Sequence, residues 1–404
     1  MRNRPVWILF FTLVVVMLGF GIVIPILPFY VTQFGGGGSA MGGLMAIYGV
    51  MQFVFAPIWG SLSDRIGRKP ILMVGVLGNA IAQVLYGFST QLWMLFAARA
   101  LAGILSSATL PTAMAYIGDS TEESERGGKM GMVGAAMGLG MVVGPGLGGW
   151  MAHLSLSAPF FLAAGLSFLA LIMVFLLLPE SHTPSQVQTA QAKPSRMRLL
   201  LKALKSPIGM LFFLSFLISF GLTNFEGIFG LYAQLRYDFT PAQVGSVLTF
   251  IGLISAIVQG ALTGPATRRW GEVTIVRVAL LSSALGFGLM LLAQNFLQVF
   301  LASGYFVLSN AMLNPSVAAL VSKRTSEEQG FTMGLNNSFL SLGRIAGPLW
   351  AGLVFDMRIF LPYLTGAVIM VIGFLFSLSI PSESPRQLSL SNTSSTENMR
   401  RELP

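Results

Sequence analysis

Long apolar stretches recur along almost the whole chain, separated by short polar segments or by segments that contain Gly and Pro. A helix needs about 20 predominantly apolar residues to cross the hydrocarbon core of a bilayer. The pattern therefore predicts an all-α polytopic membrane protein. Its twelve predicted spans cover residues 6–31, 42–62, 71–89, 92–116, 129–152, 158–178, 208–233, 242–265, 273–293, 296–321, 331–354 and 360–380.

The longest polar segment, residues 179–207, divides the predicted spans into two sets of six. It is rich in Pro, Gln and Ser, which is typical of a linker. We expect an N-terminal six-helix bundle over residues 1–178, a linker over 179–207, and a C-terminal bundle over 208–381. Residues 382–404 are rich in Ser, Asn and Thr and are expected to form a disordered tail.

The two halves are related by an internal repeat with an offset of 203 residues. The segment from Gly140 to Gly149 in the fifth span recurs as the segment from Gly343 to Gly352 in the eleventh, with Gly-Pro at the same place in each. Six spans separate the copies, so the halves have the same orientation. Parallel six-helix repeats related by an axis along the membrane normal are an architecture of transporters.

Composition agrees with the hydrophobic pattern. Only 10% of the residues are charged and 54% are hydrophobic, whereas a soluble domain is typically about 25% charged. The chain has no Cys and two His, so we predict no disulfide, no thiolate site and no His-rich metal site. The phosphate-binding loop signature is absent from the sequence, so no nucleotide cofactor is expected.

The net charge of +9 is explained by topology. With the N-terminus placed inside, all Lys and Arg residues fall in cytoplasmic segments except Arg99, Arg236, Arg344 and Arg358. Basic loops stay on the cytoplasmic side of a membrane. We therefore expect both termini in the cytoplasm and a location in the plasma membrane of a bacterium. A nucleic-acid partner is not needed to explain the basic balance.

A loop signature follows the second span: Gly60-Ser-Leu-Ser-Asp64-Arg-Ile-Gly67-Arg68-Lys-Pro. It resembles the signature of the major facilitator superfamily between spans two and three. The segment from Gly140 to Gly149 resembles the span-five motif of drug:proton antiporters. The acidic seventh span, with Glu226, resembles that of multidrug pumps of the NorA and Bmr kind. This resemblance covers the chain up to its tail.

The resemblance implies twelve helices in two pseudo-symmetric six-helix bundles that alternate in exposing a central cavity. It also implies a conformational latch, in which Asp64 lies against span eleven in the outward-facing state and has Arg68 and Asp119 as charge partners. The simpler alternative is that these charges anchor a loop. A degraded second copy carries Arg268 in place of Asp64, so a one-sided latch is expected. The implied latch residues are Gly60, Asp64, Arg65, Gly67, Arg68 and Asp119.

The motif in the fifth span has two interpretations. Gly140, Gly144 and Gly148 recur every four residues and form one small-residue face, while Pro145 removes a backbone donor. The face serves either helix packing within the bundle or the seal between the two halves, which limits proton leak. Gly149 completes the motif.

Three charged residues lie within the predicted spans: Arg99, Glu226 and Arg344. Charge is costly in a membrane and indicates function by default. Glu226 is the candidate carboxylate for a proton or a cationic substrate; the alternative is a structural pair with a buried cation such as Arg344. The family assigns Arg99 to proton coupling; the alternative is bonding to backbone carbonyls. Arg344 departs from the cation pumps and favours an anionic or zwitterionic substrate.

A substrate cavity is expected between the halves. Polar and aromatic side chains at mid-span supply a few fixed polar contacts within an apolar wall. The candidates are Gln52, Asn224, Phe225, Tyr232, Phe306, Asn310, Asn314 and Asn337.

These observations predict a proton-coupled antiporter that exports amphiphilic small molecules. We expect it to act as a monomer in contact with membrane lipids, to need no cofactor, and to use the proton gradient as its energy source. One alternative is export or flipping of an anionic or lipid-linked sugar amphiphile. Another is a membrane receptor on the same fold, although such proteins usually show decayed motifs. A membrane enzyme is less compatible, because three isolated charges form no catalytic cluster.

Overall fold

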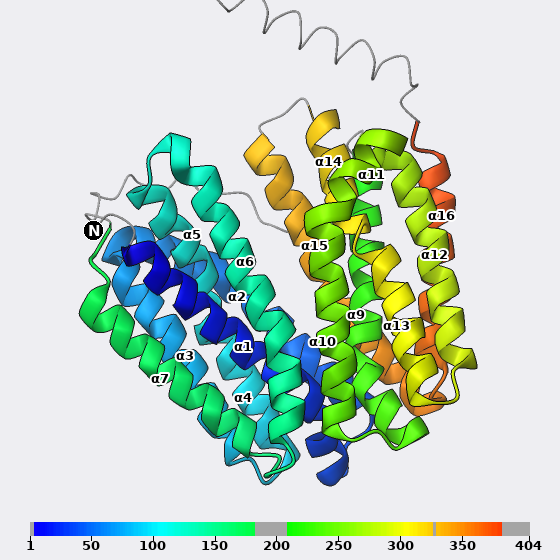
Figure 1. The fold of residues 1–404 in the computed structure, drawn as a ribbon, viewed down its shortest axis with the longest axis horizontal. Helices are drawn as coiled ribbons and strands as arrows, with labels where there is room; N and C mark the ends of the chain where they lie inside the picture. Colours follow the sequence, from blue (N-terminus) through cyan, green and yellow to red (C-terminus); the bar gives the residue numbers. More distant parts are fainter. Residues whose placement is uncertain (1–3, 182–207, 326–328, 382–404) are drawn as a thin grey trace, which may run out of the picture.

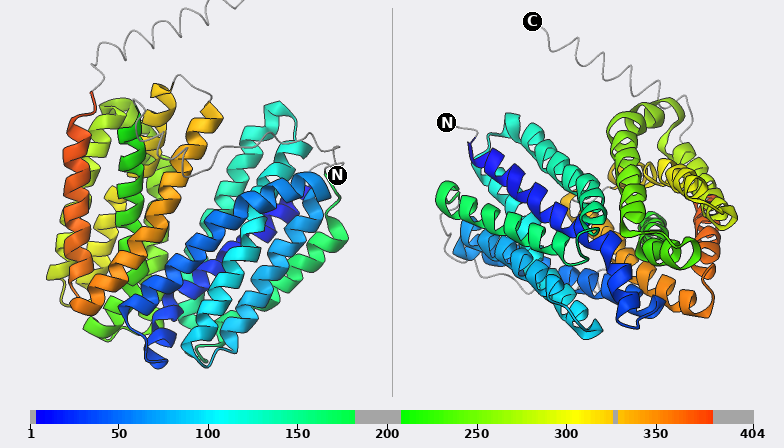
Figure 2. Two further views of the ribbon diagram at one scale, coloured as in Figure 1. Left: turned by 180° about the vertical axis from the view of Figure 1, so that it is seen from behind. Right: turned by 60° about the horizontal axis from the view of Figure 1, so that its bottom comes forward.

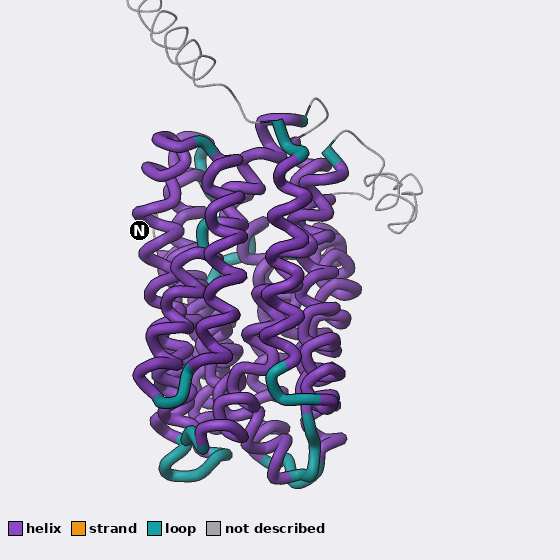
Figure 3. Tube along the Cα trace, turned by 90° about the vertical axis from the view of Figure 1, so that its right-hand side faces the viewer, coloured by secondary structure: helices purple, strands orange, loops and turns teal. Residues whose placement is uncertain are grey.

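The structure is a computed structural model and describes residues 4–181, 208–325 and 329–381. Within these ranges it contains helices and no strands (Figure 3). Twelve of its helical segments are long and apolar enough to cross a membrane. The predicted all-α polytopic fold is therefore confirmed. The predicted tail, 382–404, lies outside the described residues, as does the predicted linker except for 179–181.

The N-terminal half has six crossings, the fourth of which is broken at its middle by a short 3₁₀ segment (Figure 1). Its elements are α1 (Arg4–Gln33), α2 (Gly38–Ile66), α3 (Arg68–Gly87), α4 (Leu92–Leu105), η1 (Ser106–Ala108), α5 (Thr109–Ser120), α6 (Glu123–Met151) and α7 (Ala158–Leu177).

The C-terminal half also has six crossings. The second of them is continued by a π-helical segment and the fourth is interrupted after Asn310. Its elements are α9 (Gly209–Tyr237), α10 (Pro241–Ile257), η2 (Val258–Leu262), α11 (Thr263–Trp270), α12 (Glu272–Leu292), α13 (Phe296–Asn310), α14 (Leu313–Arg324), α15 (Gln329–Met357) and α16 (Leu361–Leu378).

The two bundles meet on one side of the molecule and diverge on the other (Figures 1 and 2). We name the side on which α1 begins and α16 ends the terminal side, and the opposite side the distal side. The main contacts between the halves join α2 to α15 and α6 to α10. These two pairs occupy equivalent positions in the repeat.

Small residues bring these helix pairs into backbone contact on the distal side. A Cβ atom at Gly42 of α2 would collide with the carbonyl oxygen of Pro348 in α15, and one at Gly245 of α10 with that of Pro145 in α6. Gly60, nearer the terminal side of α2, has no such neighbour within 4 Å. The halves are thus closed on the distal side and separated on the terminal side.

The terminal half of α2 carries a groove of about 580 Å³. Val54 and Ile58 are exposed there, whereas Leu44, farther towards the distal side of the same helix, is fully buried. The change in burial along α2 follows the divergence of the two bundles. The lining residues are Phe53, Val54, Pro57, Ile58, Ser61, Leu62 and Arg65.

The glycine face of the span-five motif lies against α1 within its own half. Cβ atoms at Gly140, Gly144 and Gly148 would lie 2.6, 2.8 and 2.9 Å from atoms of α1. Gly149 instead touches the backbone of Pro241 in α10, across the interface. The interpretation of the whole face as a seal between the halves is therefore corrected: its three regularly spaced glycines pack α1 on α6, and the interface uses their neighbours.

This packing predicts a selective loss of stability. Gly144→Ala places a methyl group 2.8 Å from the backbone oxygen of Leu18, so α1 must move, and overpacking of this kind costs about 1–3 kcal/mol. Gly138→Ala, on the same helix with no neighbour within 4 Å, is the matched control. We expect thermal unfolding in detergent to shift down for Gly144→Ala alone; equal melting curves for the two variants would contradict this packing.

Candidate functional site

Glu226 lies in α9, about 25 Å from the terminal-side start of that helix at 1.5 Å per residue. Its side chain is partly exposed, although the residues on both sides of it, Phe225 and Gly227, are buried. Within the described residues it makes no ion pair or hydrogen bond. The charged group that acts on it is the Arg344 guanidinium. Glu226 is thus a partly exposed acidic residue deep within a membrane-spanning helix, without an ion-pair partner among the described residues.

Arg344 lies on the exposed face of α15. Asn337, seven residues earlier and therefore on the same helix face, is exposed as well. The expected pair between Glu226 and Arg344 is not formed as an ion pair, but the two groups interact electrostatically. The exposed Arg344 and the partly exposed Glu226 therefore belong to one electrostatic site.

Arg99 is only 2% exposed and is surrounded by aromatic rings. Its guanidinium carbon lies 5.7, 5.5 and 5.9 Å from the ring centres of Phe20, Tyr48 and Tyr86. One of its amino groups faces the sulfur of Met45 at 3.5 Å, and its Nε has no hydrogen-bond partner among the described residues. Cation–π contacts, each worth about 0.5–2 kcal/mol, stabilise this buried charge. The alternative in which backbone carbonyls hold Arg99 is not what the structure shows.

Tyr48 is a residue of this site that the sequence interpretation missed. Its hydroxyl is under the electrostatic influence of both Arg99, in its own half, and Arg344, in the other half. It lies one helical turn before Gln52, so the two side chains share a face of α2. This spacing of four residues from Gln52, a predicted cavity residue, is the sequence feature from which Tyr48 could have been predicted. Tyr48 therefore contacts the buried Arg99 and lies within the electrostatic range of Arg344.

Several predicted cavity residues lie inside the C-terminal bundle. The rings of Phe225 and Phe306 are fully buried with their centres 4.7 Å apart, and buried Tyr232 lies 4.3 Å from the ring of Tyr363. Asn224 donates to the carbonyl oxygen of Pro362 at 2.8 Å. The prediction that these residues line the central cavity is corrected: Phe225, Phe306, Tyr232 and Asn224 are core residues of their bundle.

The remaining predicted cavity residues differ in exposure. Asn310 is 1% exposed and belongs to the bundle interior as well. Gln52 and Asn314 are partly exposed, and Asn337 is exposed. Together with Glu226 and Arg344, these three are the accessible polar residues that remain of the predicted set.

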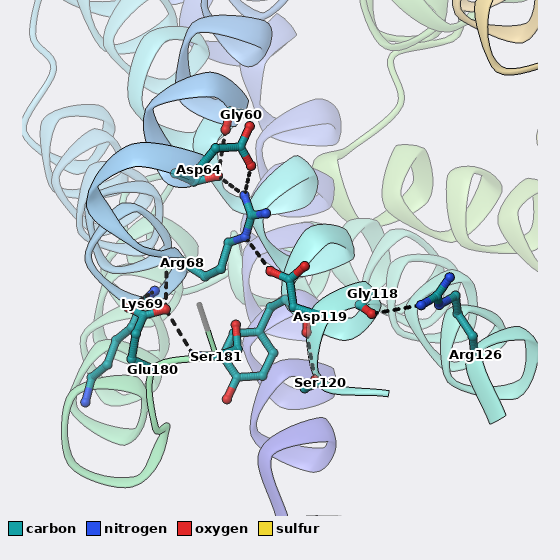
Figure 4. A network of polar contacts seen from close by, with 12 residues as sticks. Gly60, Asp64, Arg68, Lys69, Gly118, Asp119, Ser120, Arg126, Glu180 and Ser181 are labelled. Atoms are coloured by element: carbon teal, nitrogen blue, oxygen red, sulfur yellow. Dashed lines mark hydrogen bonds and ion pairs between the residues drawn. The ribbon is translucent and has the colours of Figure 1, made fainter. Parts of the chain in front are cut away.

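A charged network joins the start of α3 to the ends of α2 and α5 (Figure 4). Arg68 is 6% exposed. Its Nε donates to Asp119 Oδ2 at 2.8 Å, and its Nη1 donates to Ser63 Oγ at 2.7 Å and to Asp64. The structure thus brings Asp64, Arg68 and Asp119 together. The Asp64 side chain is 61% exposed, and the neighbouring end of α2 is separated from α15.

Glu180, which sequence analysis overlooked, completes this network. Its carboxylate accepts the backbone N–H groups of Arg68 and Lys69 at 2.9 and 3.0 Å, which caps the N-terminus of α3. Gly67 between α2 and α3 has φ +114°, and a Cβ there would lie 2.6 Å from Glu180. Glycine is therefore required at this turn. For the other two signature residues, Gly60 and Arg65, the described part of the chain shows no hydrogen bond or ion pair between the halves.

The second copy of the signature retains an ion pair with reversed signs. Lys323 Nζ lies 2.7 Å from Glu272 Oε1. Glu272 and Lys323 correspond to Arg68 and Asp119 at an offset of 204 residues. Arg268 corresponds to Asp64 at the same offset. Each half therefore ties its loop to its fourth crossing by an ion pair, while the expectation of a one-sided latch, which rests on Arg268 in place of Asp64, stays a prediction.

Among the described residues, no group of three or more His, Asp and Glu side chains could hold a metal ion. The site consists of cations, one carboxylate, amides and aromatic rings.

The sequence profile of the Major Facilitator Superfamily matches residues 9–348 and also residues 211–399. The chain belongs to the major facilitator superfamily. It is a multi-pass membrane transporter of a family that acts on small molecules, and not an enzyme. The match over both halves agrees with the internal repeat.

Curated relatives of this superfamily member are multidrug resistance proteins. Multidrug resistance protein 1 of Bacillus subtilis is 31% identical over 391 residues, which is 96% of this chain and 99% of the relative. Multidrug resistance protein 2 of the same organism is 30% identical over 91% of this chain and 92% of the relative. The quinolone resistance protein NorA of Staphylococcus aureus is 29% identical over 92% of this chain and 96% of the relative. The predicted NorA- and Bmr-like branch is thereby confirmed.

Solved structures show the same fold at lower identity. A crystal structure of a mutant of the peptide transporter POT has a TM-score of 0.78 at 18% identity and covers 95% of each chain. A bacterial homologue of the human lysosomal transporter Spinster, crystallised in an inward-facing and unoccupied conformation, has a TM-score of 0.72 at 12% identity, over 93% of this chain and 95% of that one. The arrangement of two six-helix bundles is therefore that of transporters in this superfamily.

Proposed function

We propose that this transporter is a proton-coupled antiporter that exports amphiphilic small molecules from a bacterial cell and works as a monomer in the plasma membrane. The observation that carries this proposal is Glu226, a partly exposed carboxylate deep in α9 with no ion-pair partner among the described residues. An ionisable group at that depth is costly unless it serves transport or proton transfer. The multidrug resistance proteins among the relatives support the substrate class.

The proposed orientation places the terminal side in the cytoplasm. Most basic residues at the ends of the described helices lie on that side, whereas Arg236 and Arg358 lie on the distal side. Positive charge is retained in the cytoplasm. With this orientation the structure is open towards the cytoplasm, the state in which an exporter takes up its substrate.

In the proposed cycle, substrate and proton compete for Glu226. Substrate enters from the cytoplasm and leaves after the bundles have rocked to the outward-open state. A proton from outside then neutralises Glu226, which removes its attraction to Arg344 and to a cationic substrate. Return to the inward-open state delivers the proton to the cytoplasm. Because Glu226 is the one acid of this site among the described residues, we propose that one proton crosses per cycle.

Reconstitution of the purified protein in proteoliposomes tests this function. Cationic, zwitterionic and anionic amphiphiles are offered at two pH values, with and without an imposed pH gradient. We expect gradient-driven accumulation of amphiphilic cations, together with substrate-dependent proton movement reported by a pH-sensitive dye. Accumulation that is the same in the absence of the gradient would contradict antiport.

A second candidate function, export of an anionic amphiphile, is favoured by Arg344. This arginine is exposed, and the site holds two arginines against a single carboxylate. The net positive charge of this site therefore attracts an anion. The attraction is stronger once the substrate has displaced water, because the local dielectric constant is then lower.

The two functions are separated by Arg344→Ala. For the anionic compounds we expect the initial transport rate to fall at least about tenfold, which equals ~1.4 kcal/mol of lost binding, while cation transport continues. Arg269→Ala, an exposed arginine at the terminal-side end of α11, is the control and should retain the parental rates. If cation and anion rates fall equally, Arg344 does not select the charge of the substrate.

A further inference from the structure

The distal end of α2 lacks a cap of its own. The residue at its N-cap position is Gly37, which has no side chain to accept the first backbone N–H groups of the helix. Such groups carry a partial positive charge and need acceptors. In this structure the acceptor comes from the other half of the protein.

Asp356, near the distal end of α15, occupies that position. One carboxylate oxygen accepts the backbone N–H of Gly38 at 2.6 Å, and the other accepts the N–H of Ser39 at 2.8 Å and also its hydroxyl. Asp356 and Gly38 are 318 residues apart in sequence. A carboxylate of the C-terminal half therefore caps a helix of the N-terminal half. Hydrogen bonds of this charge-assisted kind are stronger than neutral ones.

The surrounding backbone shows that this cap exists only when the distal side is closed. A Cβ at Gly38 would lie 2.6 Å from the carbonyl oxygen of Gly352, one helical turn before Asp356. At the opposite end of the same helix pair, Gly60 of α2 and Gly334 of α15 have no such neighbours within 4 Å. Opening the distal side must separate Gly38 from Gly352 and carry Asp356 away from α2.

We propose that Asp356 is the distal gate residue of this transporter: by capping α2 across the interface, it stabilises the conformation that is closed on the distal side and sets how often that side opens. It acts on the conformational equilibrium and not on the substrate. The loop signature with Asp64 lies at the other end of α2, so a carboxylate is found at each end of this helix: Asp64 of α2 itself on the terminal side and Asp356 of α15 on the distal side. The proposal rests on alternating access, and not on proton coupling or on a particular substrate.

Distance measurements between spin labels test the proposal on the full chain. The natural sequence contains no cysteine, so labels attach only where cysteine is introduced. His153→Cys with Gln294→Cys reports the distal separation of the halves, and Glu123→Cys with Arg269→Cys reports the terminal separation. All four residues are exposed.

Asp356→Asn keeps the shape of the side chain and removes its charge. We expect the ratio of distal-open to distal-closed molecules to rise at least roughly threefold, within the range that cap replacement produces. The distal pair then gains a longer distance and the terminal pair a shorter one. Asp238→Asn, an exposed distal acid that follows the last residue of α9 and for which no side-chain hydrogen bond to α2 is seen among the described residues, should leave both distributions unchanged.

Ser39→Ala provides a second variant, because it removes one of the three donors and leaves Asp356 in place. We expect a smaller shift in the same direction, so the proposal stays testable even if Asp356→Asn folds poorly. Parental distributions in both variants, or an equal shift with Asp238→Asn, would overturn it. Since the readout needs neither substrate nor a pH gradient, failure of the antiport proposal would leave this result unaffected.

Discussion

We expect Glu226→Gln to remove most of the proton-driven transport while the protein remains folded, and this is the largest functional effect that we predict. The substitution keeps the size of the side chain and removes its ability to bind and release a proton. Without this group, the accessible site of the described chain has no carboxylate to exchange a proton for a substrate. Gradient-driven accumulation in proteoliposomes should fall at least about tenfold, as expected when an intramembrane ionisable group carries function.

Two comparisons make this result specific. Glu123→Gln alters an exposed acid at the terminal-side start of α6 and should transport at the parental rate. Substrate exchange across the membrane without a gradient should survive in Glu226→Gln better than net accumulation does, because exchange needs no proton. Full gradient-driven accumulation in Glu226→Gln would falsify the assignment of Glu226 as the proton site.

Arg68→Ala is expected to reduce both stability and transport. Arg68 is 6% exposed and binds Asp64, Asp119 and Ser63 at once. Its loss removes the guanidinium that Asp64 and Asp119 share. Removal of one partner from a buried pair costs about 3–5 kcal/mol, but the 61% and 29% exposure of the two aspartates reduces this to about 1–3 kcal/mol. Thermal unfolding should therefore occur at a lower temperature.

Transport should fall with Arg68→Ala because the loop between α2 and α3 then loses its anchor to α5. Arg68→Lys should be only slightly more stable and more active than Arg68→Ala, since an ammonium group cannot reproduce the several fixed hydrogen bonds of a guanidinium. Arg126→Ala is the matched control: within the described residues the side chain of this exposed arginine donates one hydrogen bond, to the carbonyl oxygen of Gly118. A melting temperature and transport rate like those of Arg126→Ala would show that the Arg68 network is dispensable.

Much of the architecture could be predicted from sequence because the membrane restricts the possible structures so severely. Each span must be apolar and long enough to cross the bilayer, so helix number and approximate position follow from hydropathy. The 203-residue repeat then relates the halves. The charged network could be predicted in part, because its residues occur within one signature and its partner Asp119.

The cavity lining could not be predicted in the same way. Consecutive residues on a helix point about 100° apart, so Phe225, next to the accessible Glu226, turns into the bundle and packs against Phe306. A polar or aromatic residue at the right depth can therefore belong to the core or to the cavity. The rotation of each helix within its bundle decides between the two, and that rotation depends on packing against the other helices.

The sequence by itself determined the membrane class, the twelve spans, the parallel repeat, and the identity of the three charges within the spans. Only the tertiary structure decided which groups those charges meet. Arg99 is held by rings from α1, α2 and α3, and α2 is capped by Asp356, a residue 318 positions from Gly38. The physical reason is the distance in sequence between the interacting groups. The hydropathy of a span depends on consecutive residues of one helix, whereas caps and aromatic cages form between residues of separate helices that are far apart in sequence.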